Sequence, residues 1–348
     1  MIGLHPLPLL LGALILGPVL IEFPAPQDPI QEVEAEEGPH DRWLARLVDD
    51  GRPTRLDDLS GLTCAGCHQT ITEEWRHSTH ATAWIDPHYT KALKKIRRKR
   101  GCTGCHAPVP LLGKPPTKIP ATRTENPHLG VTCTTCHLAA DGETMLGPAG
   151  HANDGHPSEA NELFNHLESN ALCITCHNVN IGPVLAVAKD FKASDQAGMG
   201  DSCVGCHMPS INRAWANDEL SGELGTSRPG RSHRLETSRD PAFLRGAMNL
   251  RAEFNGTGAV LVVTNLTGHR VPGLIGRELT LRFSLYNAEG QRLSRSSHTF
   301  SHRSHLPVDA DFKIDIEGLG AAELRVSGTH KAPGIPKGIV FLERTFKR

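Results

Sequence analysis

The pentapeptide Cys64-Ala-Gly-Cys67-His68 determines the fold class of this 348-residue chain, because its Cys-x-x-Cys-His pattern recurs at 102–106, 133–137, 173–177 and 203–207. The five copies use all ten cysteines. This spacing is the attachment signal for c-type haem, in which two thiols bond to the porphyrin and the adjacent histidine binds the iron. We therefore predict five covalently bound haem c groups. The predicted attachment residues are Cys64, Cys67, Cys102, Cys105, Cys133, Cys136, Cys173, Cys176, Cys203 and Cys206, and the predicted proximal ligands are His68, His106, His137, His177 and His207.

Three other uses of cysteine explain this pattern less well. A zinc ribbon pairs two Cys-x-x-Cys knuckles, and five knuckles do not divide into pairs. Disulfides in an exported chain would require neither the constant two-residue gap nor the trailing histidine. A thioredoxin-like redox pair occurs once, in a βαβ context.

The composition indicates that the haems form much of the core. Only 38% of residues are hydrophobic and 5% aromatic. All five motifs lie within residues 64–207, so each haem has about thirty residues, too few to bury an apolar core of their own. We expect the haem edges to touch. The formal net charge of −1 gives no bias toward nucleic acid, and we expect some Lys and Arg side chains to pair with haem propionates.

The chain begins with an apolar segment. Residues 7–21 have the length of a signal-peptide core, so we predict a cleaved signal peptide at 1–25, with an uncleaved membrane anchor as the alternative. Haem attachment to cysteine takes place outside the cytoplasm, so the predicted location is periplasmic or extracellular. Residues 26–60 are acidic and proline-rich and form a predicted lead-in.

The remaining chain divides into two predicted domains. Residues 61–240 form the predicted pentahaem domain, an α and loop structure with little regular secondary structure. After residue 245 cysteine disappears, and Leu279, Leu281, Phe283 and Leu285 alternate with polar residues. Further strands are predicted at 260–266, 312–316, 324–326 and 338–346, which gives a small antiparallel β-sandwich at 245–348.

The number of distal histidines decides between an electron carrier and a catalyst. An iron with two axial imidazoles suits electron transfer, because its ligand shell changes little between oxidation states. An iron with one imidazole keeps a position where a small molecule can bind. The chain has 20 histidines, so distal ligands are available.

Several segments resemble one family. The stretch from Trp75 to Ala81, Trp-Arg-His-Ser-Thr-His-Ala, resembles the segment after the first haem in multihaem cytochromes related to the tetrahaem cytochrome of ammonia oxidisers, within the hydroxylamine oxidoreductase and pentahaem nitrite reductase superfamily. The segments at 101–108, 130–133 and 206–209 are similar to those around the second, third and last haems. Gly268-His269-Arg270-Val271-Pro272-Gly273 resembles a turn in the β-domain that some of these proteins append.

The resemblance implies which histidines are distal ligands. It assigns that role to His80, His233 and His269, and the last of these would join the β-domain to a haem iron. His156 lies in a region where relatives often place another ligand, and His128 lies just before the third motif; we predict both as further iron ligands.

The chain departs from two relatives. Pentahaem nitrite reductases place a lysine after one Cys-x-x-Cys, whereas all five motifs here end in histidine. Hydroxylamine-oxidising relatives cross-link a tyrosine to the catalytic haem, and neither Tyr89 nor Tyr286 lies in such a context. We therefore expect an electron-transfer protein rather than an enzyme.

The predicted function is single-electron transfer along closely packed bis-histidine haems between redox partner proteins. A basic run, Lys91, Lys94, Lys95, Arg97, Arg98, Lys99 and Arg100, could bind an acidic partner, although a solvated helix face is the simpler explanation. One alternative is an oxidoreductase acting on a small nitrogen or sulfur compound at an open haem, with the haem of His106 as the first candidate. Another is a subunit of a polymeric cytochrome wire.

Overall fold

The computed structural model describes residues 64–97, 99–112, 119–150, 156–168, 170–181, 185–217 and 225–348. The predicted signal or anchor at 1–25 and the lead-in at 26–60 lie outside these residues. Within the described ranges, no helix has the length and apolar character needed to cross a bilayer.

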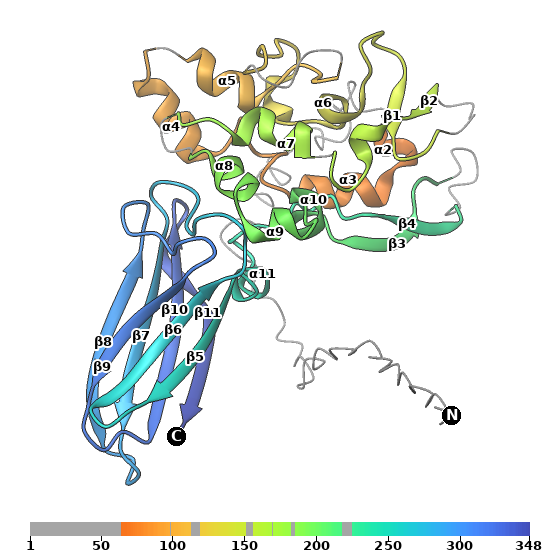
Figure 1. Ribbon diagram of the computed structural model, residues 1–348. Coiled ribbons are helices and arrows are strands. Elements are labelled where there is room, and N and C mark those ends of the chain that lie inside the picture. Colours follow the sequence, from red (N-terminus) through yellow and green to blue (C-terminus); the bar gives the residue numbers. More distant parts are fainter. Residues whose placement is uncertain are drawn as a thin grey trace, which may run out of the picture.

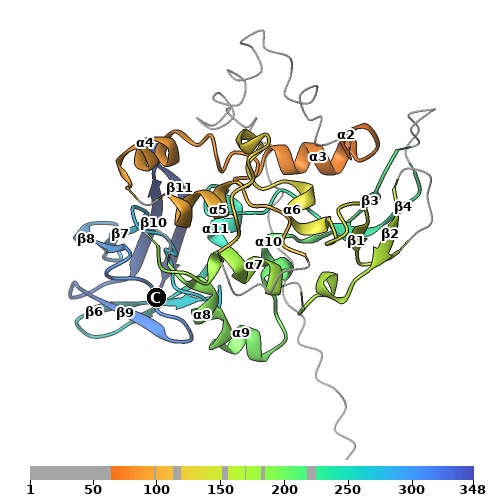
Figure 2. The ribbon, with the colours of Figure 1, turned by 90° about the horizontal axis from the view of Figure 1, so that it is seen from above.

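The chain forms two parts, and the first part lies against one end of the second, which is built of β-strands (Figure 1). We call residues 64–240 the motif region and residues 245–348 the β region. Viewed from above, the motif region spreads as short helices and connecting loops rather than as a helical bundle (Figure 2). Its elements are α2(Cys64–Cys67), α3(Gln69–Arg76), α4(Pro87–Lys95), α5(Arg100–His106), η1(Pro127–Leu129), α6(Cys133–His137), β1(Met145–Gly147), β2(Ser158–Ala160), η2(Glu162–Phe164), α7(Asn170–His177), α8(Val187–Lys192), α9(Asp195–Gly198), α10(Cys203–His207), β3(Ser210–Ala214) and β4(Ser227–Arg231).

Each haem motif lies on a short helix, namely α2, α5, α6, α7 or α10. Helical geometry explains this, because residues three and four apart share one face, so the two cysteines and the histidine can face the same porphyrin. Side-chain caps fix where two of these helices begin. The Ser202 hydroxyl accepts from the Gly205 amide at 3.0 Å, and Thr132 forms a capping box with Thr135.

Helix α11(Pro241–Arg245) leads into the β region, which contains two antiparallel sheets. One has the order β11-β10-β7-β8 and the other β5-β6-β9. The strands are β5(Met248–Phe254), β6(Gly258–Asn265), β7(Glu278–Tyr286), β8(Arg292–Phe300), β9(Asp311–Glu317), β10(Glu323–Ala332) and β11(Ile335–Lys347). The alternation predicted at 279–285 is observed in β7, where Leu279, Leu281, Phe283 and Leu285 are all buried.

The apolar core of the protein is divided very unequally. The main cluster of buried side chains lies within the β region and its lead-in helix and joins residues of both sheets, such as Leu261 and Val263 of β6 with Leu281 of β7. The motif region has a small cluster of Trp75, Ala81 and Leu129. The β region therefore carries a core of its own, whereas the motif region lacks a core of comparable size.

This difference predicts how the two regions behave without haem. When the chain is produced under conditions that prevent haem attachment, trypsin should digest the motif region and leave the β region as a protected fragment, because only the latter buries enough apolar surface. Mass spectrometry of the digest identifies the fragment, with the haem-loaded protein as the control. A motif region that resists trypsin without haem would contradict the expectation.

Candidate haem centres

Four of the five proximal histidines have the same backbone contact. The Nδ1 atoms of His68, His137 and His207 lie 2.6, 2.7 and 2.6 Å from the carbonyl oxygens of Trp215, Leu146 and Glu236. His106 Nδ1 makes the equivalent contact with the Ala83 carbonyl. A carbonyl can only accept, so Nδ1 carries the proton and Nε2 keeps the lone pair that an iron requires.

Four proximal histidines face a second histidine at a nearly constant distance. The ring centroids are 6.3 Å apart for His68 and His156 and for His137 and His233. They are 6.4 Å apart for His177 and His80 and for His207 and His269. Each pair joins residues that are far apart in the sequence.

This distance fits one iron between two imidazoles. A metal–imidazole bond is about 2.0 Å and the ring centroid lies about 1.1 Å behind the nitrogen, so two imidazoles on opposite sides of one metal have centroids roughly 6.2 Å apart. Rings in direct contact would be much closer. The residues present therefore fit a haem iron in each of the four gaps, held by His68 and His156, His137 and His233, His177 and His80, and His207 and His269.

Three of the four facing histidines have the protonation state that iron binding needs. Burial and, to a smaller extent, the neighbouring imidazoles lower the pKa of His80 to about 4. Burial, with the charge of His137, lowers the pKa of His233 to about 4. Burial likewise lowers the pKa of His269. A neutral imidazole is the form that binds a metal.

A close backbone approach fixes the position of His80. The His80 carbonyl accepts from the Val131 amide at 3.0 Å, and the Trp75 indole donates to the Val131 carbonyl at 2.7 Å. Gly130 has a φ of +67°, and a Cβ there would lie 2.3 Å from the His80 carbonyl oxygen. The segment before the third motif therefore requires glycine, because no side chain fits against the ligand loop.

A buried ion pair holds His233. Glu74 of α3 accepts from the His233 amide at 2.8 Å and forms an ion pair with Arg213 of β3 at 2.7 Å. Their side chains are only 13% and 9% exposed. Such a pair is costly to break, because the remaining partner would be an uncompensated buried charge. Sequence reasoning missed Glu74 and Arg213, since neither lies in a recognisable motif.

His106 has a different neighbour. The ring of Tyr89, from α4, stacks on the His106 imidazole with centroids 3.6 Å apart and planes 7° apart. Within the described part of the chain, the Tyr89 hydroxyl is buried without a hydrogen-bond partner. Burial raises the Tyr89 pKa to about 12, so the phenol stays protonated. None of the four facing pairs includes His106, and His128 lies in η1, outside these pairs.

Cysteines of different motifs lie side by side. Hydrogen-bonding contacts join the thiols of Cys64 and Cys133, of Cys105 and Cys176, and of Cys173 and Cys203. All ten cysteines are free of disulfides. These contacts bring together the cysteines that would attach the first and third haems. They do the same for the second and fourth haems and for the fourth and fifth haems.

Part of the sequence and the fold as a whole are similar to those of known cytochromes. The sequence model of the family described as cytochrome c554 and c-prime matches residues 63–138. The crystal structure of a penta-heme cytochrome c552 from Thermochromatium tepidum matches 82% of this chain and 97% of its own, with 18% identity and a TM-score of 0.57. The solution structure of a protein from Arabidopsis thaliana covers 29% of this chain and 76% of its own at 14% identity, but its TM-score of 0.18 supports no argument. No curated protein matches the chain.

Replacing His269 tests the pairing of the β region with the fifth motif. His269→Ala should convert one iron from low spin to high spin, because the imidazole facing His207 is lost, and should make the link between the regions more sensitive to protease. Electron paramagnetic resonance counts the irons of each kind. The control is His77→Ala, which removes an exposed histidine that contacts Glu73. Unchanged spectra and protease resistance in His269→Ala would contradict the assignment.

Proposed function

We propose that this chain is an exported pentahaem c-type cytochrome that carries single electrons between redox partners. The five motifs, the cytochrome family match at 63–138 and the fold shared with a penta-heme cytochrome support a multihaem c-type cytochrome. The carrier function rests chiefly on one observation, the four histidine pairs at 6.3–6.4 Å. Export rests on the apolar segment at 7–21 and on the chemistry of haem attachment.

The protein residues supply what an electron carrier needs. Haem, when bound, supplies a one-electron couple at each iron. The facing histidines fill both axial positions, which keeps the ligand shell nearly the same in both oxidation states. The adjoining thiols support close packing of the first site with the third and of the fourth site with the second and fifth. Cys136 of the third motif also interacts electrostatically with Cys173 and Cys176 of the fourth, which supports packing of these two sites. We also infer that the two sheets of the β region form a sandwich, supported by their shared core.

The site of His106 favours a second candidate function. Tyr89 stacks on the His106 ring, and His106 belongs to none of the four pairs. We infer that this iron keeps an open position where a small nitrogen or sulfur compound could bind. We also propose that the chain is distantly related to hydroxylamine-oxidising enzymes, and the sequence segments at 75–81 and 268–273 support this relation.

Spin counting tests both parts of the proposal. Low-temperature electron paramagnetic resonance of the oxidised protein should show four low-spin irons and one high-spin iron, and cyanide should convert the high-spin signal. Five low-spin irons would exclude the open site. Two or more high-spin irons would contradict at least one of the histidine pairs.

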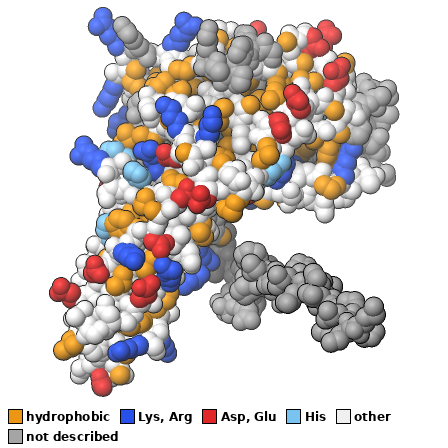
Figure 3. Space-filling view, in the orientation of Figure 1, with side chains coloured by type: hydrophobic (Ala, Val, Ile, Leu, Met, Phe, Trp, Pro, Cys, Tyr) orange, Lys and Arg blue, Asp and Glu red, His pale blue; other side chains and the backbone are white. Residues whose placement is uncertain are grey.

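The basic run can be assessed as a docking surface. Lys91, Lys94, Lys95, Arg97, Lys99 and Arg100 are all exposed, and no ion pair involving them is found in the described residues. They lie on α4, in the link that follows it and at the start of α5, directly ahead of Cys102. Figure 3 shows Lys and Arg side chains at this edge of the molecule. We propose that this surface steers an acidic redox partner toward the second haem site.

Charge neutralisation tests the docking surface. Replacing Lys91, Lys94 and Lys95 with glutamine should slow oxidation of the reduced protein by ferricyanide, a small anionic probe, by about 10-fold at low ionic strength. The effect should disappear as salt is raised, because exposed charges are then screened.

The control for this experiment changes the same number of charges elsewhere. Lys313, Lys337 and Lys347 are exposed on the β region, and their replacement with glutamine should have a much smaller effect on the rate. Equal rates in the two triple variants would show that only net charge matters and would remove the docking proposal.

A further inference from the structure

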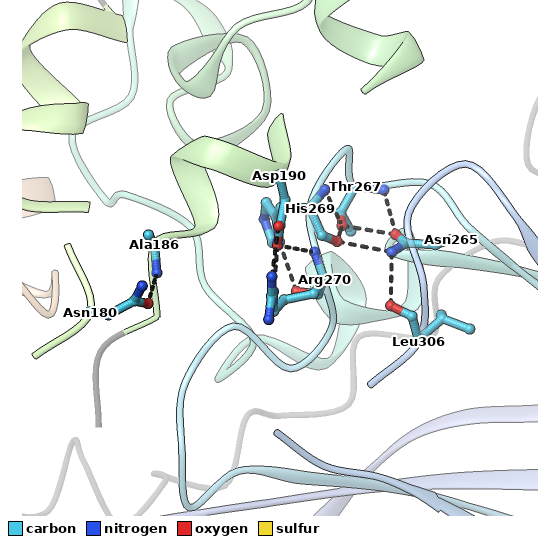
Figure 4. Close-up of polar contacts among 8 residues, drawn as sticks. All are labelled: Asn180, Ala186, Asp190, Asn265, Thr267, His269, Arg270 and Leu306. Atoms are coloured by element: carbon cyan, nitrogen blue, oxygen red, sulfur yellow. Dashed lines mark hydrogen bonds and ion pairs between the residues drawn. The ribbon is translucent and has the colours of Figure 1, made fainter. Parts of the chain in front are cut away.

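The turn that carries His269 is tied to the motif region by one carboxylate. Asp190, in α8, accepts three hydrogen bonds from Arg270, the residue directly after His269 (Figure 4). Arg270 Nε lies 2.6 Å from Oδ2, Nη2 lies 2.8 Å from Oδ1, and the Arg270 amide lies 3.2 Å from Oδ2. This two-pronged geometry fixes both the position and the orientation of the turn.

The same turn is held rigidly from the β-region side. The His269 carbonyl accepts from Asn265 Nδ2 at 2.9 Å and from the Thr267 hydroxyl at 2.7 Å. Asn265 is 3% exposed and also donates to the Leu306 carbonyl at 3.4 Å. His269 Nδ1 lies 3.0 Å from the Arg270 carbonyl, which leaves Nε2 for the iron. These contacts fix the turn that carries the imidazole to the β region (Figure 4).

Asp190 is in turn fixed relative to the haem motifs. Helix α8 lies between α7 and α10, which carry the fourth and fifth motifs. The Asn180 side chain accepts from the Ala186 amide at 3.0 Å and so anchors the start of α8. A Cβ on Gly268 would lie 2.9 Å from Phe191 and 3.0 Å from Ser194, so the turn packs closely on the end of α8. Asp190 thus links the ligand turn to a helix that is anchored next to the fourth motif.

We propose that the Asp190–Arg270 pair positions His269 as the sixth ligand of the fifth haem, so that the coordination of this haem depends on docking of the β region against α8. The proposal rests on the proposed function, because it takes the His207 and His269 pair as an iron site. Both residues are positioning residues, since neither lies at the iron.

The pair is well suited to this role. The side chains of Asp190 and Arg270 are 15% and 32% exposed, so water only partly screens their charges. A second hydrogen bond between the two regions, from the Asp195 amide to the Asp309 carboxylate at 3.0 Å, is exposed. Only its acceptor carries a formal charge, whereas both partners are charged in the Asp190–Arg270 pair. Lysine cannot replace Arg270, because an ammonium group cannot make the two parallel hydrogen bonds of the guanidinium.

The test measures how often the sixth position opens. In Asp190→Asn, the ratio of docked to undocked His269 should fall about 10-fold or more, as expected for loss of a charge-assisted bidentate contact. Cyanide binds an iron when its sixth ligand is absent. Cyanide binding at the fifth haem should therefore be at least ten times faster in this variant than in the unmodified protein. Any cyanide binding at the open second haem is a separate phase, present in both proteins. Added imidazole should suppress the faster phase at the fifth haem.

A second ion pair serves as the control. Arg251 and Asp311 join β5 and β9 at 2.7 Å within the β region. Asp311→Asn should leave the cyanide kinetics unchanged. Arg270→Lys is the second test variant and should show the same faster phase, and its interpretation requires five haems per chain by pyridine haemochrome.

The outcomes separate this inference from the function on which it rests. If His269→Ala opens one iron while Asp190→Asn and Arg270→Lys, each with five haems, bind cyanide like the unmodified protein, the positioning role is wrong and the ligand assignment stands. If His269→Ala itself opens no iron, the ligand assignment fails and this inference fails with it. If Asp311→Asn has the same effect as Asp190→Asn, a general loosening of the β region explains the result and the inference is overturned.

Discussion

Facing imidazoles at 6.3–6.4 Å are the constraint on which the arrangement of the motif region depends. Each pair brings together segments that are 62 or more residues apart, such as His207 and His269. The buried apolar cluster around Trp75 is too small to hold these segments in place. We therefore propose that axial ligation and thioether attachment take over the role that a hydrophobic core has elsewhere. The polar contacts beside the ligands, such as Glu74 with Arg213, then determine where each imidazole lies.

The β region follows the opposite principle. Two antiparallel sheets bury an apolar core that needs no cofactor, and only the turn around His269 reaches a candidate iron site. A rigid domain that supplies one ligand can hold that ligand in place more precisely than a loop of the motif region could. The Asp190–Arg270 pair gives this arrangement its anchor on the motif side.

Residue patterns predicted some elements better than others. The alternation of apolar and polar residues was sufficient to predict β7, because every second side chain of this strand is buried. Strand β8 was missed because it is an edge strand whose residues, apart from Phe300, are exposed or half-buried, so no hydrophobic period marks it. His80, His233, His269 and His156 each face a proximal histidine, whereas His128 lies outside these pairs. The ligand role of all five histidines stays a prediction.

The sequence alone determined the chemistry, because covalent attachment requires two cysteines and a histidine at one fixed local spacing, which a linear pattern displays completely. Only the tertiary structure decided which distal histidine faces which motif, and that Tyr89 stacks on His106. Those relations depend on how distant segments fold back on each other. No local spacing records them, because a distal ligand can come from any segment, or even from the other domain, that reaches the far side of the porphyrin.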